Sequence, residues 1–407
     1  MEEIRIKKYA NLIAAVGANV QKGEEVWIIA GLEQPRFVEM VVEECYKLGA
    51  KKVVVTWNHQ PISKLSNKYM SVGELARLTN YDIAKLKYRV KKLPTMIYIE
   101  SDDPDGLKGM NLKKSAKARK KSYPKIKPFV DAMDDKYKWV IAAVPGLKWA
   151  KKVFPKASDE EAVELLWEAI LETSRANGNP VENWAKHNDF LKKQRQKLDD
   201  LHLDYLHYTS KNGTDFKVWM IEDAVWLGGG EYLEDRRFYN PNIPSEESFT
   251  TPMKGKAEGL LVATKPLSYQ GNLIENFSLR FKDGKVVEVK AEKGQDLLEE
   301  MVNMDEGASM LGEVALVPHD SPISNSGLLF FNTLFDENAA CHVALGRGFG
   351  MTIKDSFSYS QEELKAKGVN DSMIHVDFMI GSKDLNIVGY TRAGKKVQIF
   401  KDGNWAI

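Results

Sequence analysis

Two residues near the carboxyl end of the chain combine an imidazole and a carboxylate at a spacing that suits chemistry. His375 and Asp377 lie in Met-Ile-His-Val-Asp-Phe-Met-Ile, a run whose apolar residues predict a β-strand. Because residues i and i+2 of a strand point to the same face, the ring and the carboxylate converge on one point. Such a pair can line a reactive cleft, or it can simply satisfy itself through a hydrogen bond.

A second histidine, His342, follows a polar turn that starts at Asp336, and it begins an apolar stretch. This position predicts that His342 lies at the edge of an element. Cys341 precedes it, but neighbouring residues of a strand point to opposite faces, so the two do not suit a nucleophile and its base. We therefore expect Cys341 to be a small core residue.

Two further carboxylates occur in contexts that invite attention. Glu313 lies in Leu-Gly-Glu-Val-Ala-Leu-Val-Pro, an apolar strand-like run in which a buried acid needs a partner or a metal ion. Glu247 lies in a loop sequence opened by Asn242 and Pro244, and alone it would be an ordinary loop acid. Glu313 is also the best candidate for a general base, with a ligand role as the competing interpretation.

Together these residues supply two imidazoles and three carboxylates, which is the ligand chemistry of a two-metal hydrolase. One bridging carboxylate would allow five protein ligands to hold two ions about 3.5–4 Å apart. No thiolate is needed, so Zn, Co and Mn are all compatible, and we expect two divalent ions per chain. The candidate ligands are Glu247, Glu313, His342, His375 and Asp377.

The elements expected in the first half of the chain alternate between short β-branched runs and helical patterns, which indicates parallel βαβ units. Strands are predicted at 25–30, 52–57, 95–100 and 138–144, and helices at 35–48 and 159–176. Ser158 and Glu161 have the spacing of a capping box at the start of the second helix. We expect an α/β amino-terminal domain over residues 1–200.

The second half consists of short segments bounded by Gly, Asn and Pro, which predicts a β-rich α+β domain over residues 201–407. A charged helix is predicted at 190–203 and one clear helix at 294–303. Asp283-Gly284 is typical of a two-residue hairpin turn. The predicted strands are 216–220, 259–263, 279–282, 285–290, 374–380, 387–391 and 396–401.

The composition describes a folded chain with little electrostatic bias. The 407 residues include 58 Lys and Arg against 57 Asp and Glu, and 43% are hydrophobic, which suggests two or three domains and excludes a largely disordered chain. The apolar runs are shorter than a membrane helix needs, and residues 1–22 lack the pattern of a secretory or transit signal, so we expect a soluble protein without a membrane partner. The two cysteines, Cys45 and Cys341, favour a reducing cytoplasm.

One local exception is a run of nine Lys or Arg, without an acid, between Lys108 and Lys127. A nucleic-acid site would need interleaved aromatic residues for stacking, and Tyr123 is the only one in this run. We interpret the run as a solvent-exposed face and expect no nucleic-acid partner.

A nucleotide-binding oxidoreductase is one alternative function. The run Gly346-Arg-Gly-Phe-Gly350 follows an apolar stretch, but its spacing is G-x-G-x-G rather than G-x-G-x-x-G. No acidic residue ends a following strand about 20 positions later, as a dinucleotide site requires. The glycines at 228–230 lack a preceding βαβ unit. This class is therefore disfavoured.

Four stretches around the candidate ligands resemble the aminopeptidase T and aminopeptidase S family of metallo-aminopeptidases, and they occur in the same order. They are Asn-Ile-Pro-Ser-Glu-Glu-Ser-Phe-Thr-Thr-Pro (242–252), Leu-Gly-Glu-Val-Ala-Leu-Val (311–317), Leu-Phe-Asp-Glu-Asn-Ala-Ala-Cys-His-Val-Ala-Leu-Gly (334–346) and His-Val-Asp-Phe-Met-Ile-Gly (375–381). Further agreement at 149–155, 161–167 and 212–216 extends the resemblance over nearly the whole chain.

This resemblance implies a metal-dependent aminopeptidase that hydrolyses the amino-terminal residue from peptides with a free amino terminus. It also implies an amino-terminal α/β domain, a carboxy-terminal catalytic domain, a dinuclear metal site and a homodimer. The family's ligands fall on the five residues that the residue chemistry already selects, namely Glu247, Glu313, His342, His375 and Asp377.

The chain departs from the family at one position that matters for catalysis. The family usually continues Ala-Leu-Gly-x-Ala-Tyr after the metal-binding histidine, whereas this chain has Ala-Leu-Gly-Arg-Gly-Phe, with Phe349 in place of the tyrosine. A phenyl ring cannot donate a hydrogen bond to an oxyanion. Tyr359 could replace the hydroxyl, the metals alone could polarise the carbonyl, or the enzyme could be slower. A noncatalytic or weakly active peptide-binding homologue is therefore the second alternative.

Overall fold

The computed structural model describes residues 2–407, which fold into two compact units. The first unit holds the chain as far as Lys186, together with Gly230–Pro244 and Gln270–Asn272. The second holds His187–Gly229, Ser245–Tyr269 and Leu273–Ile407. The chain crosses between the units several times, whereas the sequence suggested one boundary after residue 200. The simpler division into domains 1–200 and 201–407 stays a prediction.

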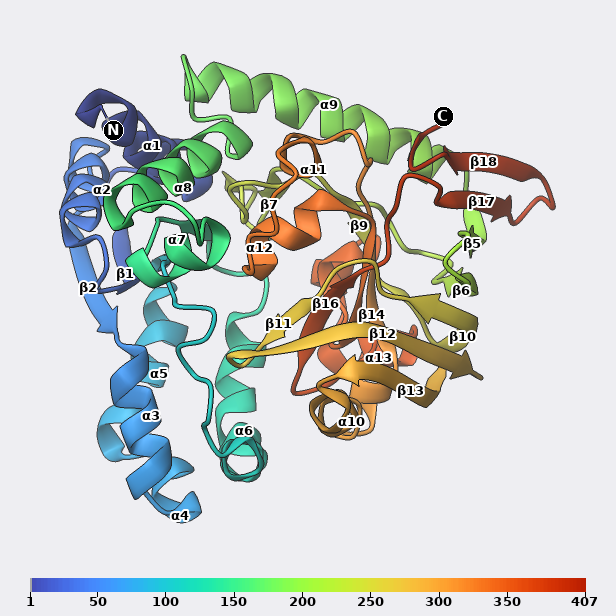
Figure 1. The fold of residues 1–407 in the computed structure, drawn as a ribbon, viewed down its shortest axis with the longest axis horizontal. Coiled ribbons are helices and arrows are strands. Elements are labelled where there is room, and N and C mark those ends of the chain that lie inside the picture. The colour runs from blue at the N-terminus through green and yellow to red at the C-terminus, as the bar shows by residue number, and fades with distance from the viewer. Residues whose placement is uncertain (1) are drawn as a thin grey trace. The chain divides into compact units, whose positions relative to one another are not determined.

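A parallel sheet of four strands in the order β2-β1-β3-β4 forms the centre of the first unit. Figure 1 labels two of these strands, β1 and β2. Val26, Ile28 and Ile97 on these strands are fully buried, as the near-continuous apolar runs of parallel strands require. The predicted α/β character of this half is confirmed. The strands are β1 (Glu25–Gly31), β2 (Lys52–Asn58), β3 (Thr95–Glu100) and β4 (Trp139–Ala143), and β7 (Glu231–Tyr232) and β8 (Phe238–Tyr239) add a small hairpin.

Helices connect the strands of the first unit. The predicted capping box of α8 is present, with Ser158 Oγ accepting a hydrogen bond from Glu161 N and the Glu161 carboxylate accepting one from Ser158 N, both at 3.2 Å. The helices are α1 (Glu3–Leu12), α2 (Pro35–Lys47), α3 (Gln60–Tyr69), α4 (Val72–Leu75), α5 (Asn80–Lys92), α6 (Leu112–Met133), α7 (Leu147–Val153) and α8 (Asp159–Thr173), with a π-helical turn at Ile13–Gly17.

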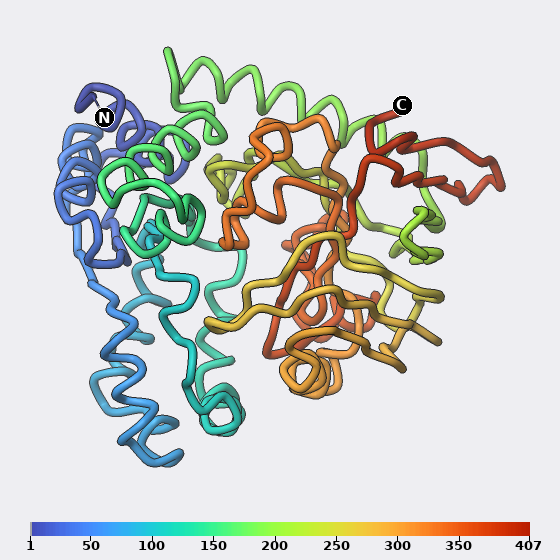
Figure 2. The backbone as a smooth tube through the Cα atoms, viewed as in Figure 1, coloured from blue at the N-terminus to red at the C-terminus, as the bar shows by residue number. Residues whose placement is uncertain are grey.

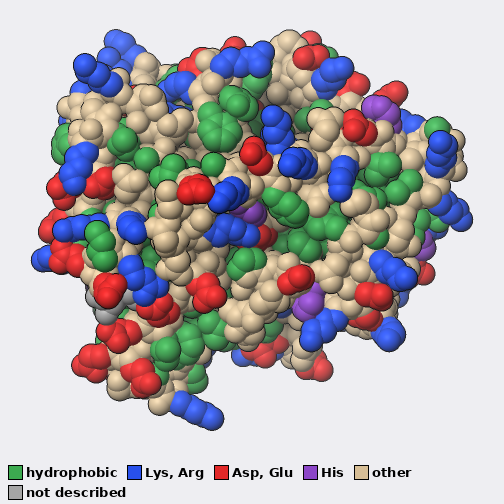
Figure 3. All heavy atoms as spheres, turned by 90° about the horizontal axis from the view of Figure 1, so that it is seen from above, with side chains coloured by type: hydrophobic (Ala, Val, Ile, Leu, Met, Phe, Trp, Pro, Cys, Tyr) green, Lys and Arg blue, Asp and Glu red, His purple; other side chains and the backbone are tan. Residues whose placement is uncertain are grey.

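One helix starts earlier than predicted, and another carries the basic run. Helix α9 (Pro180–Asp200) begins ten residues before the predicted start at 190, because Pro180 occupies the first helical position, where its fixed φ angle suits a helix. Most of the basic run lies on α6, where Lys117, Lys120 and Lys121 are exposed to solvent. On the face shown in Figure 3, basic and acidic side chains are interspersed, in keeping with the net charge of +1.

The second unit is built on two antiparallel sheets. The larger has nine strands in the order β11-β12-β10-β6-β5-β17-β18-β19, with β13 paired to β12, and the smaller has the order β16-β15-β14-β9. Strands β5 and β17 lie side by side although they are far apart in the sequence (Figure 2). The strands are β5 (Leu203–Thr209), β6 (Asp215–Met220), β9 (Ser248–Thr250), β10 (Pro252–Val262), β11 (Leu267–Tyr269), β12 (Asn272–Lys282), β13 (Lys285–Lys293), β14 (Leu311–Leu316), β15 (His342–Gly346), β16 (His375–Met379), β17 (Asn386–Thr391), β18 (Lys396–Lys401) and β19 (Asn404–Trp405).

Local signals in the second half are largely confirmed. Asp283 and Gly284 adopt positive φ angles of 49° and 75° between β12 and β13, as the predicted hairpin turn requires. The predicted helix at 294–303 is α10 (Gln295–Val302). Three short helices were not predicted, namely α11 (Pro322–Asn325), α12 (Thr333–Asp336) and α13 (Gln361–Ala366). Across residues 2–407, every helix is too short or too polar to cross a membrane.

Candidate metal centre

The smaller sheet of the second unit carries all five candidate ligands. Each of its four strands contributes, because Glu247 immediately precedes β9, Glu313 lies on β14, His342 begins β15, and His375 and Asp377 lie on β16. The sheet therefore assembles residues that are separated by up to 130 positions in the sequence, as follows from 377 minus 247.

The register of the strands explains why the side chains share one face. Glu313 pairs with Ala344, and Ala344 pairs with Asp377, so these three residues form a row across the sheet. His375 pairs with Gly346 in the next row on that face. Side chains of directly paired residues lie on the same face. Because Ala344 and Gly346 have little or no side chain, they leave space between the acidic and imidazole groups.

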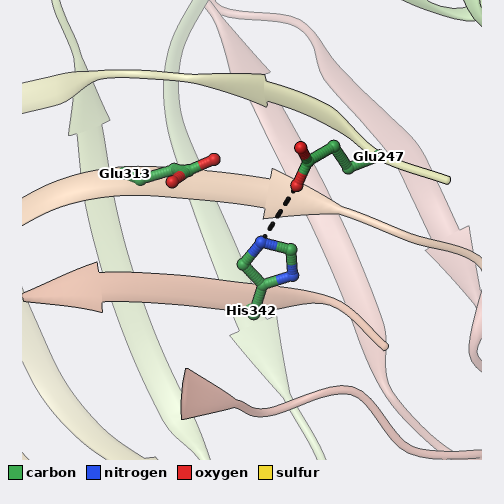
Figure 4. Close-up of side chains that lie close together, drawn as sticks. All are labelled: Glu247, Glu313 and His342. Atoms are coloured by element: carbon green, nitrogen blue, oxygen red, sulfur yellow. Dashed lines mark ion pairs between the residues drawn. The ribbon is translucent and has the colours of Figure 1, made fainter. Parts of the chain in front are cut away.

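The ligand atoms form two groups that share Glu313. The atoms of Glu247, Glu313 and His342 lie within 4.8 Å of one another, and so do those of Glu313, His375 and Asp377. His342 Nε2 lies 3.1 Å from Glu247 Oε2, and the three side chains of the first group converge (Figure 4). His375 Nε2 lies 3.0 Å from Glu313 Oε2 and 3.4 Å from Asp377 Oδ1. Each group combines one imidazole with two carboxylates.

Backbone carbonyl groups orient both imidazoles. His342 Nδ1 lies 3.1 Å from Ala340 O, and His375 Nδ1 lies 2.7 Å from Arg347 O. A carbonyl can only accept, so Nδ1 carries a proton in each ring and Nε2 faces the carboxylates. Metal-binding histidines typically donate their other N–H group in this way. Both rings are therefore held in the orientation that a ligand needs.

Burial and charge shift the pKa values of these groups strongly. Burial raises the pKa of Glu313 to about 7, assisted by the negative charges of Glu247 and Asp377. Burial alone would lower the pKa of His342, but its hydrogen bond to Glu247 and the surrounding carboxylates raise it to about 10. The pKa of His375 is raised for the same reason, against its burial, chiefly by Asp377. Without a metal ion, both imidazoles thus hold protons among the carboxylates.

The donor set fits divalent cations. Asp377 Oδ1 is buried and accepts no hydrogen bond of standard geometry within residues 2–407, and the His375 imidazole, 3.4 Å away, is its ion-pair partner. Glu313 and His342 are only 4% and 1% exposed. Imidazole nitrogens and carboxylate oxygens suit Zn, Co and Mn. Two closely spaced metal ions could use Asp377 Oδ1 and the shared carboxylate of Glu313 as ligands.

A fourth carboxylate, Glu337, belongs to the same electrostatic neighbourhood and was not selected from the sequence. Burial and the negative charges of Asp377 and Glu247 raise its pKa well above the usual range. It begins the 3₁₀ turn Glu337–Ala339, within the polar run that precedes β15. That run resembles an ordinary solvent-exposed loop, and only its position five residues before His342 could have drawn attention to it.

Asn338 fixes the loop that carries Glu247. Its Oδ1 atom accepts a hydrogen bond of 2.7 Å from Glu246 N, and its Nδ2 atom donates one of 2.8 Å to Leu334 O. Asn338 is fully buried, so both bonds lie away from bulk water. His187 Nε2 also hydrogen-bonds Ser245 O, at 2.6 Å. These hydrogen bonds fix the two residues that directly precede Glu247.

Phe349 lies against the candidate ligands. Its ring centroid is 4.7 Å from that of His375 and 5.5 Å from that of Phe249. Its backbone is also fixed, since Phe349 N donates a 2.8 Å hydrogen bond to Thr251 Oγ1. Position 349 thus borders the candidate metal centre, and it presents a phenyl ring there.

Tyr359, the other aromatic residue selected from the sequence, has different surroundings. Its ring packs against a buried cluster that includes Ile353 and Leu364, and Lys367 Nζ lies 4.5 Å from the ring centroid. Within residues 2–407, these contacts do not include the five candidate ligands. The ring of Tyr359 thus packs beside Lys367 and this cluster, and its role as a substitute hydroxyl stays a prediction.

Cys341 is a core residue, as predicted. It is 1% exposed, burial raises the pKa of its thiol to about 12, and its Sγ atom lies 3.3 Å from Val317 O. Gly346, which the sequence placed in a glycine run, has a φ angle of 107°, and an added Cβ would lie 2.1 Å from Ile374 O. This glycine thus serves close packing between β15 and the start of β16.

The whole chain is similar to known proteases. A family model described as thermophilic metalloprotease (M29) matches residues 2–405. Aminopeptidase AmpS of Bacillus subtilis (strain 168) is 42% identical over 406 residues, which cover 99% of this chain and 98% of that protein. Aminopeptidase 2 of Geobacillus stearothermophilus is 40% identical with the same coverage. Among solved structures, wild-type AmpT from Thermus thermophilus matches with a TM-score of 0.88 and 33% identity over 100% of both chains.

Proposed function

Because the chain belongs to the M29 family of thermophilic metalloproteases, and its matched relatives are named aminopeptidases, we propose that it removes single residues from the free amino end of peptides. The observation that carries this proposal is the pair of buried ligand groups that share Glu313. Two groups with one common carboxylate suit two ions rather than one.

The residues that would hold these ions fall into two sets. Glu247 and His342 would serve one ion, His375 and Asp377 the other, and Glu313 would bridge them. Bound Zn, Co or Mn would supply a Lewis acid for the scissile carbonyl and a water whose pKa is lowered to about 7. The shared position of Glu313 supports its role as a ligand over its role as general base.

The remaining acid, Glu337, extends the site beyond the five residues. Its elevated pKa favours the protonated form in the absence of an ion, so it can either bind a cation after losing its proton or exchange a proton with the substrate. The surplus of carboxylates over imidazoles also suits the ammonium group of a peptide substrate. This charge pattern supports an exopeptidase that reads a free amino terminus.

Assembly and location follow from the resemblance and from the cysteines. We expect a homodimer, as in the family that the chain resembles. A cytoplasmic location is supported by Cys45 and Cys341, which are both buried and form no disulfide. A weakly active or noncatalytic homologue remains the second candidate, because Phe349 offers no hydroxyl beside His375.

A matched set of substrates and variants tests the proposal. Metal content and turnover of a chromogenic aminoacyl amide are measured before and after chelation, together with cleavage of a free peptide and its N-acetylated form. We expect about two ions per chain and cleavage of the free peptide alone. Asp377→Asn should lose metal and activity, whereas Asp402→Asn, at an exposed acid, should keep both. Equal cleavage of the acetylated peptide would contradict an exopeptidase.

A further inference from the structure

A cavity of about 1000 Å³ lies in the first unit, at the edge of the parallel sheet where its strands end. Gly31 ends β1, Asn58 ends β2, and Ser101 follows β3, and all three line the cavity. In the order β2-β1-β3-β4 the chain leaves β1 for β2 and then returns to the other side of β1. Open α/β sheets bind ligands at this switch point. The candidate metal ligands do not line this cavity.

The residue that follows β3, Ser101, lines the cavity. Ser101 is 2% exposed, and its hydroxyl makes no hydrogen bond to any group in residues 2–407. A Cβ atom at Gly31 would lie 2.3 Å from Ser101 Oγ, so glycine is required at the end of β1 to make room for this hydroxyl. A hydroxyl that lines a cavity and makes no hydrogen bond to the protein is available to a ligand.

Three carboxylates line the cavity close to Ser101 along the chain or in space: Asp102 and Asp103 follow it directly, and Glu33 lies next to Gly146, as does Ser101 O. Burial and the negative charges of Asp103 and Glu33 raise the pKa of Asp102. Lys148 is the nearest cation recorded for this group, with its Nζ atom 3.7 Å from Asp103. Three carboxylates with one lysine leave negative charge uncompensated, so this end suits an ammonium group.

Lysines line the cavity farther along α3. Gln60, at the start of α3, exchanges two hydrogen bonds of 3.1 Å with the backbone of Asp103, which ties this end of the helix to the acids. Lys64 and Lys68 follow on the same helix face, about 6 and 12 Å farther on at 1.5 Å per residue. Neither forms an ion pair within residues 2–407. This end of the cavity therefore suits a carboxylate.

We propose that this cavity binds a short peptide with both ends free. The ammonium group lies with Asp102 and Ser101, and the carboxylate lies with Lys64 and Lys68. An extended chain spans about 3.3–3.6 Å per residue, so two to four residues match the spacing between the two ends. A single amino acid is too short to reach both. This binding site is additional to the proposed aminopeptidase activity, because the cavity would bind the peptide without cleaving it and without a metal ion.

Calorimetric titration of the full-length, metal-containing protein tests this site. The probe is trialanine with an N-methylated first peptide bond, whose integrity is checked by chromatography, and the comparison ligands are its N-acetyl form, its carboxyl amide and alanine. The variants are Asp102→Asn and Lys64→Met, and the matched control is Lys117→Met, at an exposed lysine of α6 that does not line the cavity. Thermal unfolding of every variant verifies that it is folded.

The expected result is end-specific. Asp102→Asn should weaken binding of the free peptide about tenfold and leave binding of the N-acetyl form unchanged. Lys64→Met should also weaken binding of the free peptide about tenfold, but it should leave binding of the carboxyl amide unchanged. Lys117→Met should bind normally, alanine should bind much more weakly, and turnover of the aminoacyl amide should not change in any of the three. Equal binding by all variants would overturn the proposal, as would a loss of turnover in Asp102→Asn, which would make the cavity part of the catalytic site.

Discussion

Glu313 lies in both ligand groups. The sequence allowed two roles for this residue, metal ligand and general base, and its shared position favours the ligand role. We expect Glu313→Gln to lower the metal content well below two ions per chain, because an amide loses the negative charge that two cations would share. Turnover should fall by at least about 100-fold. Metal analysis and kinetics are measured on the same sample, with Glu306→Gln as a control at an exposed acid. Full metal content with lost turnover would instead identify Glu313 as the general base.

A second residue-scale prediction concerns Phe349, whose ring lies 4.7 Å from that of His375. Phe349→Tyr adds one oxygen to a ring of similar shape and restores a donor, which is typically worth about 2.7–4 kcal/mol of transition-state stabilisation. We expect turnover to rise by about 100-fold or more with unchanged metal content. Phe357→Tyr, at an exposed ring, is the matched control.

The companion variant is Tyr359→Phe, which should leave turnover nearly unchanged because Tyr359 packs beside Lys367 rather than beside the ligands. A large loss in Tyr359→Phe, together with no gain in Phe349→Tyr, would show that Tyr359 supplies the hydroxyl after all. A folded but slower Phe349→Tyr protein would show that the pocket has adapted to the phenyl ring.

The chemistry of single residues predicted the members of the candidate site only where their neighbours in the sequence were unusual. Glu313 was noticed because an acid in an apolar run is costly, and His375 with Asp377 because strand geometry places them together. Glu337 was missed because acids are common in polar turns, and its burial depends on packing that the local sequence does not encode. Glu337 is buried by residues distant in the sequence, and this is why it was missed, whereas the apolar neighbours of Glu313 already indicated burial.

At the scale of elements, the sequence predicted strands but not their partners. The runs at 25–30 and 95–100 match β1 and β3, because apolar β-branched residues indicate a buried strand locally. The pairing of β9 with β14 joins residues about 65 apart and depends on the folded sheet, so periodicity could not predict it. This pairing brings Glu247, which precedes β9, to the strand of Glu313.

The row formed by Glu313, Ala344 and Asp377 yields a prediction for β15. Ala344→Leu should reduce metal content, since a branched side chain would enter the space between the two carboxylates. Overpacking itself should destabilise the fold by about 1–3 kcal/mol. Val343→Leu adds one carbon on the opposite face of the same strand. It should also destabilise the fold by overpacking, but it should keep its full metal content. Two ions per chain in Ala344→Leu would contradict the space that we assign to the ions.

At the scale of the whole molecule, the metal-free protein carries protons where ions would bind. The pKa of His342 is about 10 and that of Glu313 about 7, so at pH 7.5 the imidazole is protonated and the carboxyl group is partly protonated. Metal binding must displace these protons, because ligands bind in their deprotonated forms. Affinity for the ions should therefore rise about tenfold per pH unit for each proton released.

The same protons set the pH dependence of stability. A folded-state pKa raised above the unfolded value stabilises the protein below the unfolded pKa, and this contribution is lost as the pH rises through the folded pKa. For Glu313 the loss falls between the ordinary glutamate range and about pH 7, and for His342 between the ordinary histidine range and about pH 10. The metal-free protein should thus unfold at progressively lower temperature from pH 6.5 to pH 9, while added metal stabilises it increasingly over that interval. Unfolding temperatures with and without Zn²⁺, and proton release in calorimetry buffers of different ionisation enthalpy, measure both effects. A pH-independent difference between the two forms, with no protons released, would mean that the imidazoles are not the ligands.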